Sequence, residues 1–213
     1  MENRKIIGLS AVIAIAICCV GCGSGSSGGS DDNDLSETQA DALSGQIADA
    51  AVNAMNSGNF AAMVSKALAG EDLPSKIAKT IQCNDAGCTI NVPIDYGVNC
   101  TAGGRIAVTG SITGSTSSSG TGILQIGATE TITDWECISG FIINGDPYIS
   151  LSGTFSFLNG APSTQQSLTI SGGFKWGTTA AESCQIHLST NFYTSGGGTT
   201  TGTICGYTVN ESF

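Results

Sequence analysis

The sequence has few charged residues, few aromatic residues and a single histidine. Asp, Glu, Lys and Arg make up only 11% of its 213 residues, Phe, Trp and Tyr only 6%, and 7 basic residues stand against 17 acidic ones. The acidic balance argues against nucleic acid as a partner, because phosphate backbones are bound by Lys and Arg. One histidine, His187, and no CxxC pair among the cysteines after Cys22 argue against a metal site. We therefore expect no cofactor, no metal and no enzymatic activity.

The first 22 residues combine a basic tip, a short apolar run and a small residue before a cysteine. Arg4 and Lys5 carry the charge, Ile6–Val20 is a run of 15 apolar or small residues, and Gly21 precedes Cys22. A helix that crosses a membrane needs about 20 residues, so this run is too short to span. The pattern is typical of an export signal.

The sequence Val20-Gly21-Cys22 resembles the lipobox of bacterial prolipoproteins, although Cys19 stands where leucine is usual. The resemblance implies cleavage before Cys22, acylation of Cys22, and a membrane as partner through the lipid. It implies a place in the bacterial cell envelope, and Gly23 after the cysteine favours the outer membrane. Plain secretion with a free Cys22 is the alternative.

Composition divides the chain into three parts. Residues 1–21 form the expected signal peptide, and residues 22–34 carry the lipidated cysteine followed by a Gly/Ser/Asp tether without large apolar side chains. Residues 35–213 are long enough for one domain with a substantial core. We expect residues 35–72 to be helical and residues 80–213 to be rich in β-strands.

Two helices are expected in the first part of the domain. Ser36 and Gln39 have the spacing of a capping box, and an apolar stripe follows them. Asn56–Asn59 interrupts the stripe, and Gly70 marks the end of a second helix.

From about residue 80 the hydrophobic period changes to two. Apolar residues alternate with Thr, Ser, Asn and Gln, which is typical of antiparallel strands with one wet face. Turn pairs Asn144-Gly145 and Asn159-Gly160, and the segment 195–198, lie between the apolar runs. The fold class expected is therefore α+β, mainly β: a curved antiparallel meander sheet or partly closed barrel of about eight strands, capped by the helices. A two-layer β-sandwich is the alternative.

Six cysteines remain after the export signal and Cys22, and an even number in an exported chain indicates disulfides. They allow 15 connectivities, among which sequence alone does not choose. The simplest is the sequential set: Cys83–Cys88, Cys100–Cys137 and Cys184–Cys205.

Glu130 shares the inward phase of Leu124, Ile126 and Ala128, so a regular strand would bury its carboxyl. A buried carboxyl has a raised pKa and can act as an acid or anchor a ligand. A bulge near Gly127 would instead expose it. The candidate ligand site comprises Glu130, Trp135, Phe155 and Trp176.

The remaining candidates are surface residues. Asp134, Glu136 and Asp146 could form a carboxylate pair for hydrolysis or a cation site, although their spacing is diagnostic of neither. His187 alternates with polar residues on the wet face, and no nucleophile elbow accompanies it. Tyr148 and Tyr193 also have the outward phase, where aromatic rings can stack on sugars or peptides.

Three functions follow from these features. The first is a binding or scaffold module of the envelope, with an envelope protein, a glycan or a lipid as ligand. The second is a carrier of an apolar ligand, with a cavity lined by residues such as Ile149, Phe155, Phe174 and Trp176. The third is a carboxylate-based hydrolase.

Overall fold

The computed structural model describes residues 35–57, 60–73, 78–138, 141–176, 182–194 and 196–213. All of them belong to one compact unit that spans residues 33–213. The expected signal peptide, Cys22 and the tether lie outside the described residues. Within the described ranges, none of the helices combines the length and hydrophobicity needed to cross a membrane.

Two helices precede the strands, α1 (Glu37–Asn56) and α2 (Phe60–Leu68). The predicted capping box is present: Gln39 N–H donates to Ser36 Oγ at 3.3 Å, and Ser36 N–H donates to Gln39 Oε1 at 2.9 Å. The predicted stop at Gly70 is also present, because Gly70 has a φ of 72° and its N–H donates to the carbonyl oxygen of Ala67. Glycine adopts this left-handed conformation without a Cβ penalty.

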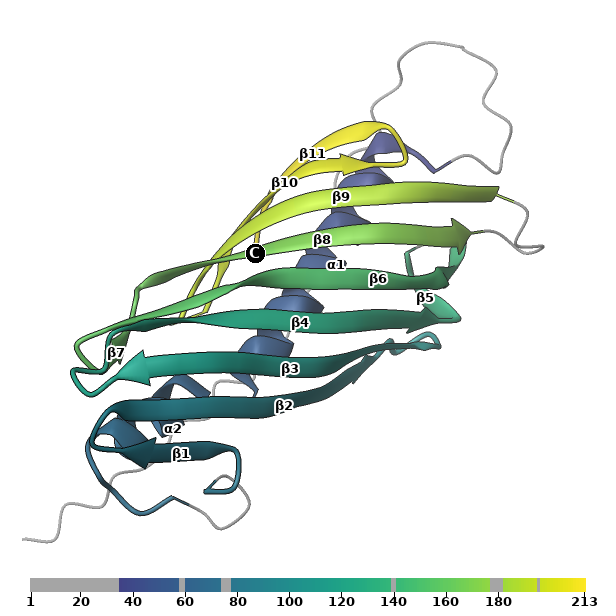
Figure 1. Cartoon of the computed structure of the whole chain (residues 1–213). Helices are drawn as coiled ribbons and strands as arrows, with labels where there is room; N and C mark the ends of the chain where they lie inside the picture. The colour runs from purple at the N-terminus through teal and green to yellow at the C-terminus, as the bar shows by residue number, and fades with distance from the viewer. Residues whose placement is uncertain (1–34, 58–59, 74–77, 139–140, 177–181, 195) are drawn as a thin grey trace, which may run out of the picture. The chain divides into compact units, whose positions relative to one another are not determined.

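The strands form one antiparallel sheet (Figure 1). Nine follow one another in the order β1-β2-β3-β4-β6-β8-β9-β10-β11, and β5 and β7 pair with β6 beside this path. Their bounds are β1 Ile81–Asn84, β2 Gly87–Asn99, β3 Arg105–Ser117, β4 Gly122–Thr133, β5 Trp135–Ile138, β6 Phe141–Leu158, β7 Ala161–Pro162, β8 Gln165–Trp176, β9 Glu182–Tyr193, β10 Gly198–Ile204 and β11 Tyr207–Ser212. The curved antiparallel sheet is confirmed, with more strands than the eight expected, and the sheet does not close into a barrel. The β-sandwich alternative is wrong, since all the described strands belong to one sheet.

The inner face of the sheet is apolar, as the period of two predicts. Along β2, Ile90, Val92 and Ile94 are buried while the residues between them are exposed. The same alternation recurs on the long strands, and it buries the following residues: Ile106, Val108, Ile112, Leu124, Ile126, Ile149, Leu151, Phe155, Phe157, Leu168, Ile170, Phe174, Ile186, Leu188 and Phe192.

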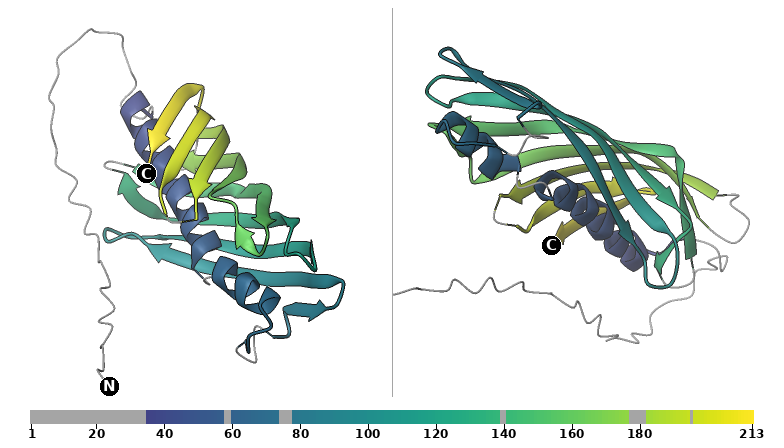
Figure 2. Two further views of the ribbon diagram at one scale, coloured as in Figure 1. Left: turned by 90° about the vertical axis from the view of Figure 1, so that its left-hand side faces the viewer. Right: turned by 90° about the horizontal axis from the view of Figure 1, so that it is seen from below.

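Helix α1 covers this inner face (Figure 2). It contacts β2 and β3 on one side of the sheet and β9, β10 and β11 on the other, so the sheet curves around it. Ten of its residues are buried, five of them alanines, and small side chains allow the helix to lie close to strands on both sides. The helix therefore occupies the space that a curved sheet would otherwise enclose.

Three disulfides join neighbouring elements, and they confirm the sequential pairing. Cys83–Cys88 joins β1 to β2 at directly opposite positions. Cys100–Cys137 joins the end of β2 to β5, and Cys184–Cys205 joins β9 to the turn after β10.

One of the turn predictions is wrong. Asn159-Gly160 connects β6 to β7, and both residues have a positive φ, as this turn requires. Asn144-Gly145 instead lies inside β6, next to a register shift between Gly145 and Ile149. The Asn144 side chain does not close a turn. Its Oδ1 accepts a hydrogen bond from the N–H of Asp134, just after the end of β4, at 2.9 Å.

Candidate functional site

Glu130 points into the core, as its phase predicts. Strand β4 pairs with β3 in continuous register from Gly122 to Thr133, so the alternative of a bulge near Gly127 is wrong. Glu130 lies between Val108 and Ile149 of the neighbouring strands, and all three side chains are fully buried. Burial raises the pKa of the Glu130 carboxyl well above its usual value. Among the described residues, neither carboxyl oxygen has a hydrogen-bond partner, so the apolar surroundings favour the neutral form of Glu130.

Trp135 is also buried, and it attaches α1 to the end of the sheet. Its indole N–H donates to Gln46 Oε1 at 2.7 Å. A buried indole N–H needs an acceptor, so this bond fixes the position of the helix relative to β5.

Phe155 and Trp176 belong to the packed core. Phe155 meets Phe60 of α2 edge-on at a centroid distance of 5.3 Å and lies 5.5 Å from Phe157. The ring of Trp176 lies 5.9 Å from that of Phe174. Four hollows lie on the surface of the described residues, and none of the four is lined by Glu130, Trp135, Phe155 or Trp176. The candidate ligand-site residues therefore contribute to the core in this structure.

The three candidate carboxylates have separate surroundings. Asp134 is exposed and accepts a hydrogen bond from Asn144 Nδ2 at 3.2 Å, whereas Asp146 forms an ion pair with Lys175 at 3.1 Å. The carboxyl of Glu136 lies against Gly103. Across the ranges that the structure describes, no group of three or more His, Cys, Asp or Glu residues could hold a metal ion.

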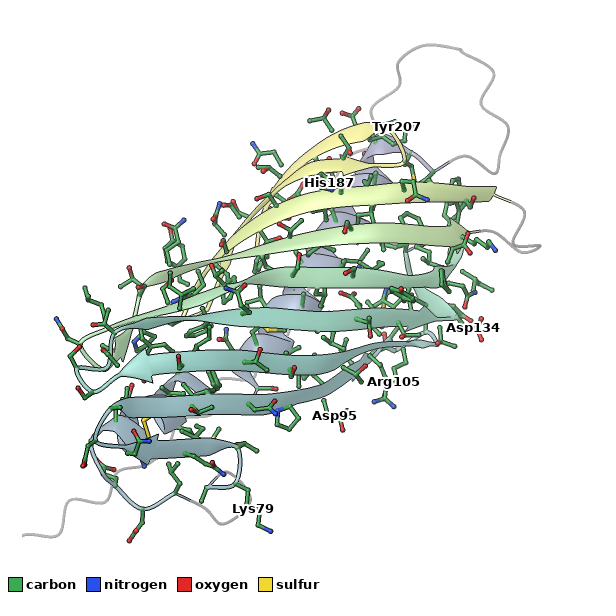
Figure 3. All side chains as sticks on the ribbon, viewed as in Figure 1. Lys79, Asp95, Arg105, Asp134, His187 and Tyr207 are labelled. Atoms are coloured by element: carbon green, nitrogen blue, oxygen red, sulfur yellow. A yellow bond between two sulfur atoms is a disulfide. The ribbon has the colours of Figure 1, made fainter. Side chains whose placement is uncertain are left out.

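The outer face of the sheet carries rows of mostly small, uncharged polar residues that cross the strands. Figure 3 labels two residues of this face, Asp95 and His187. The strand register places these residues side by side. One row is Asn91, Thr113, Gln125, Thr154, Ser167, Asn191, Thr199 and Ser212. A second row is Pro93, Ser111, Gly127, Ser152, Thr169, Ser189, Thr201 and Asn210. A third is Asp95, Thr109, Thr129, Ser150, Ser171, His187, Thr203 and Thr208.

We call these three rows the hydroxyl rows. Their 24 positions include one carboxylate, Asp95, and one imidazole, His187. His187 is exposed in the third row, as its phase predicts. Hydroxyl groups of neighbouring strands meet within the rows, as at Thr109 and Thr129, whose Oγ1 atoms are 3.4 Å apart. The strand pattern of the sequence predicts each outward residue, but the rows themselves depend on the register between strands.

A polar hollow adjoins the first row where that row crosses β6, β8 and β9. It has a volume of about 270 Å³, and its lining comprises Thr154, Ser156, Gln165, Gln166, Ser167 and Asn191. Tyr193 pairs with Gln165 at its border and is 48% exposed, so an aromatic ring stands beside a group of hydroxyl and amide side chains. Tyr148 is 50% exposed near the other end of the strands, at the start of the regular part of β6.

Comparison of the chain with protein-family models, with curated proteins and with solved structures finds no match. The class of protein is therefore defined by its structure: a disulfide-linked open antiparallel sheet that curves around an N-terminal helix and presents a hydroxyl-rich outer face.

Proposed function

We propose that the chain is a binding module of the bacterial cell envelope, anchored through a lipid on Cys22, which contacts a neutral glycan with its outer face. The observation that carries the proposal is the set of hydroxyl rows across eight strands. Sugar hydroxyls both donate and accept hydrogen bonds, and Ser, Thr, Asn and Gln side chains offer both functions without a net charge. The scarcity of charge on these rows favours a neutral ligand over a phosphate or a nucleic acid.

The polar hollow at Tyr193 is the proposed centre of this contact. Tyr193 supplies an exposed ring face for the apolar side of a sugar, and Asn191 and Gln165 supply amide groups next to it. Support for an apolar-ligand carrier is weaker, because α1 occupies the inner face and Phe155 and Trp176 are packed in the core.

Binding to immobilised neutral polysaccharides tests the ligand class. We expect Tyr193→Ala to weaken binding about twofold to twelvefold, which corresponds to the roughly 0.5–1.5 kcal/mol of an aromatic contact. Tyr148→Ala is the matched control, since Tyr148 has the same exposure but lies outside the polar hollow. Equal loss in both variants, or binding that neither variant changes, would contradict the proposed centre.

The anchor has its own test. We expect the protein to incorporate labelled palmitate and to fractionate with membranes, and we expect Cys22→Ser to lose both properties. Unchanged labelling of Cys22→Ser would exclude this cysteine as the acylation site.

A further inference from the structure

More than half of strand β2 has no partner on its outer edge among the described residues. β1 pairs with β2 only from Gly87 to Ile90, and one further bond joins Asn91 N–H to the carbonyl oxygen of Thr80 at 2.7 Å. β2 continues to Asn99, paired with β3 alone. Successive residues of a strand point their main-chain groups to opposite sides. The bond from Asn91 therefore shows that Asp95, Gly97 and Asn99 direct their N–H and C=O groups to the free edge.

A hollow lies beside this free edge. It has a volume of about 410 Å³, within the size range of ligand pockets. Its lining includes the consecutive β2 residues 92–97, Ile112 of β3, and Ala54, Met55, Ser57 and Phe60 from the junction of α1 and α2. Because both inward and outward residues of β2 line it, the hollow occupies the position that the next strand of the sheet would take.

The inner side of this hollow is apolar. Ile94 points inward at its base, and Tyr96 and Val98 are only partly buried against the core. Met55 and Phe60 form the opposite wall. An added strand would therefore place alternate side chains on an apolar surface while its backbone pairs with β2.

Charge favours a basic partner segment. Asp95 lines the hollow, and Asp49 of α1 is close enough to Tyr96 to raise the pKa of the Tyr96 phenol, after the larger effect of burial. Arg105 is the nearby cation, and its guanidinium lies against Gly97. The net charge of −10 disfavours a second copy of this chain as the occupant.

We propose that the free edge of β2 from Asp95 to Asn99, together with the adjoining hollow, binds an extended segment of a partner protein by strand addition. The segment alternates apolar residues, which enter the hollow, with basic residues. Pro93 limits the pairing, because proline has no N–H to donate at the edge. This site takes in Pro93 and Asp95 at the ends of two hydroxyl rows, but it shares no residue with the polar hollow beside Tyr193, the proposed centre of the glycan contact, so either proposal can fail without the other.

Residue-resolved amide hydrogen exchange of the intact chain, kept in detergent, tests the proposal. The probe is a short synthetic peptide in which valine alternates with lysine, and the comparison peptide replaces lysine with glutamate. We expect the lysine peptide to slow exchange at Asp95, Gly97 and Asn99 by about tenfold or more, because their N–H groups become bonded. The amides of Ile94 and Tyr96, which bond to β3, serve as the internal control.

Two variants separate the edge from the hollow. Asp95→Pro removes an N–H group at the edge and should abolish the slowing of amide exchange by the lysine peptide. Asp95→Asn removes only the charge and should make that slowing smaller. Ser57→Trp fills the hollow without changing β2 and should also abolish it. The proposal is overturned if no peptide slows these three amides, if the glutamate peptide acts equally well, or if slowing occurs at β11 instead. Slowing that depends on protein concentration without peptide would identify a second copy as the occupant and would also overturn it.

Discussion

Replacing Glu130 by methionine should stabilise the domain. The Glu130 side chain is fully buried, and in the part of the chain that the structure describes neither carboxyl oxygen has a hydrogen-bond partner. An unsatisfied buried polar group costs about 1–3 kcal/mol, and methionine has a similar length without that cost. For a domain of this size a gain of about 2 kcal/mol raises Tm by about 4–8 °C.

The gain from Glu130→Met should depend on pH. Burial raises the pKa of folded Glu130, whereas in the unfolded chain it ionises near its usual pKa of about 4.3. Below that pKa the carboxyl is protonated in both the folded and the unfolded state, so it does not make the free energy of unfolding depend on pH. As pH rises toward the folded pKa, the unfolded state is favoured by about 1.4 kcal/mol per pH unit. The free energy of unfolding of wild type should therefore fall relative to that of Glu130→Met between about pH 4.3 and the raised pKa of folded Glu130. At pH values above the raised pKa this difference should stay constant.

Urea unfolding of both proteins from pH 4 to pH 8, with the disulfides intact, measures this difference. Glu130→Gln is the control, because it keeps a polar group but cannot ionise. Its stability should match that of wild type near pH 4 and exceed it near pH 7. A constant difference between wild type and both variants across this range would refute the interpretation of Glu130 as a raised-pKa core carboxyl.

Three further changes test the packing around α1 and the sheet. Gln46→Ala leaves the Trp135 indole N–H without its acceptor and should cost about 1–3 kcal/mol by urea unfolding, whereas Gln46→Glu, which keeps an acceptor, should cost less. Phe60→Ala removes a ring that joins α2 to the sheet and should lower unfolding free energy by about 3–5 kcal/mol; a loss below about 1 kcal/mol would mean that α2 is not held by this ring. Replacing Cys100 and Cys137 by serine releases a bridge with a sequence separation of 37 and should cost about 4 kcal/mol, and an unchanged Tm would contradict the bridge.

The period of two and the cap residues predict most of the fold. Local rules determine which side of a strand is apolar, and this is why the burial of Ile90 and Val92 follows from sequence alone. The burial of Glu130 also required a strand without a bulge near Gly127, and only the register between strands shows this. Asn144-Gly145 fails as a turn because a tertiary contact with Asp134 and a register shift keep the chain in β6. Turn propensity contains no information about such contacts between strands.

The surface sites were less predictable than the core. Tyr193 can be assigned to the outer face from its phase, but the polar hollow depends on the register between β6, β8 and β9. The free edge of β2 exists because β1 pairs only with residues 87–90 of β2. No residue pattern in the sequence predicts the short length of β1. Both sites arise from pairing between segments, and a single strand pattern does not specify its partner.

Glycan binding by the outer face is tested most directly by residue-resolved NMR chemical-shift mapping of the domain, residues 35–213, with a neutral oligosaccharide selected from the polysaccharide binding assay. Glycan binding at the polar hollow should give shifts confined to the outer face and centred on Thr154, Asn191 and Tyr193, with the inner residues Phe155 and Trp176 unaffected. Shifts centred on Phe155 and Trp176, or no shift at any outer-face residue, would contradict a glycan-binding role for the hydroxyl rows.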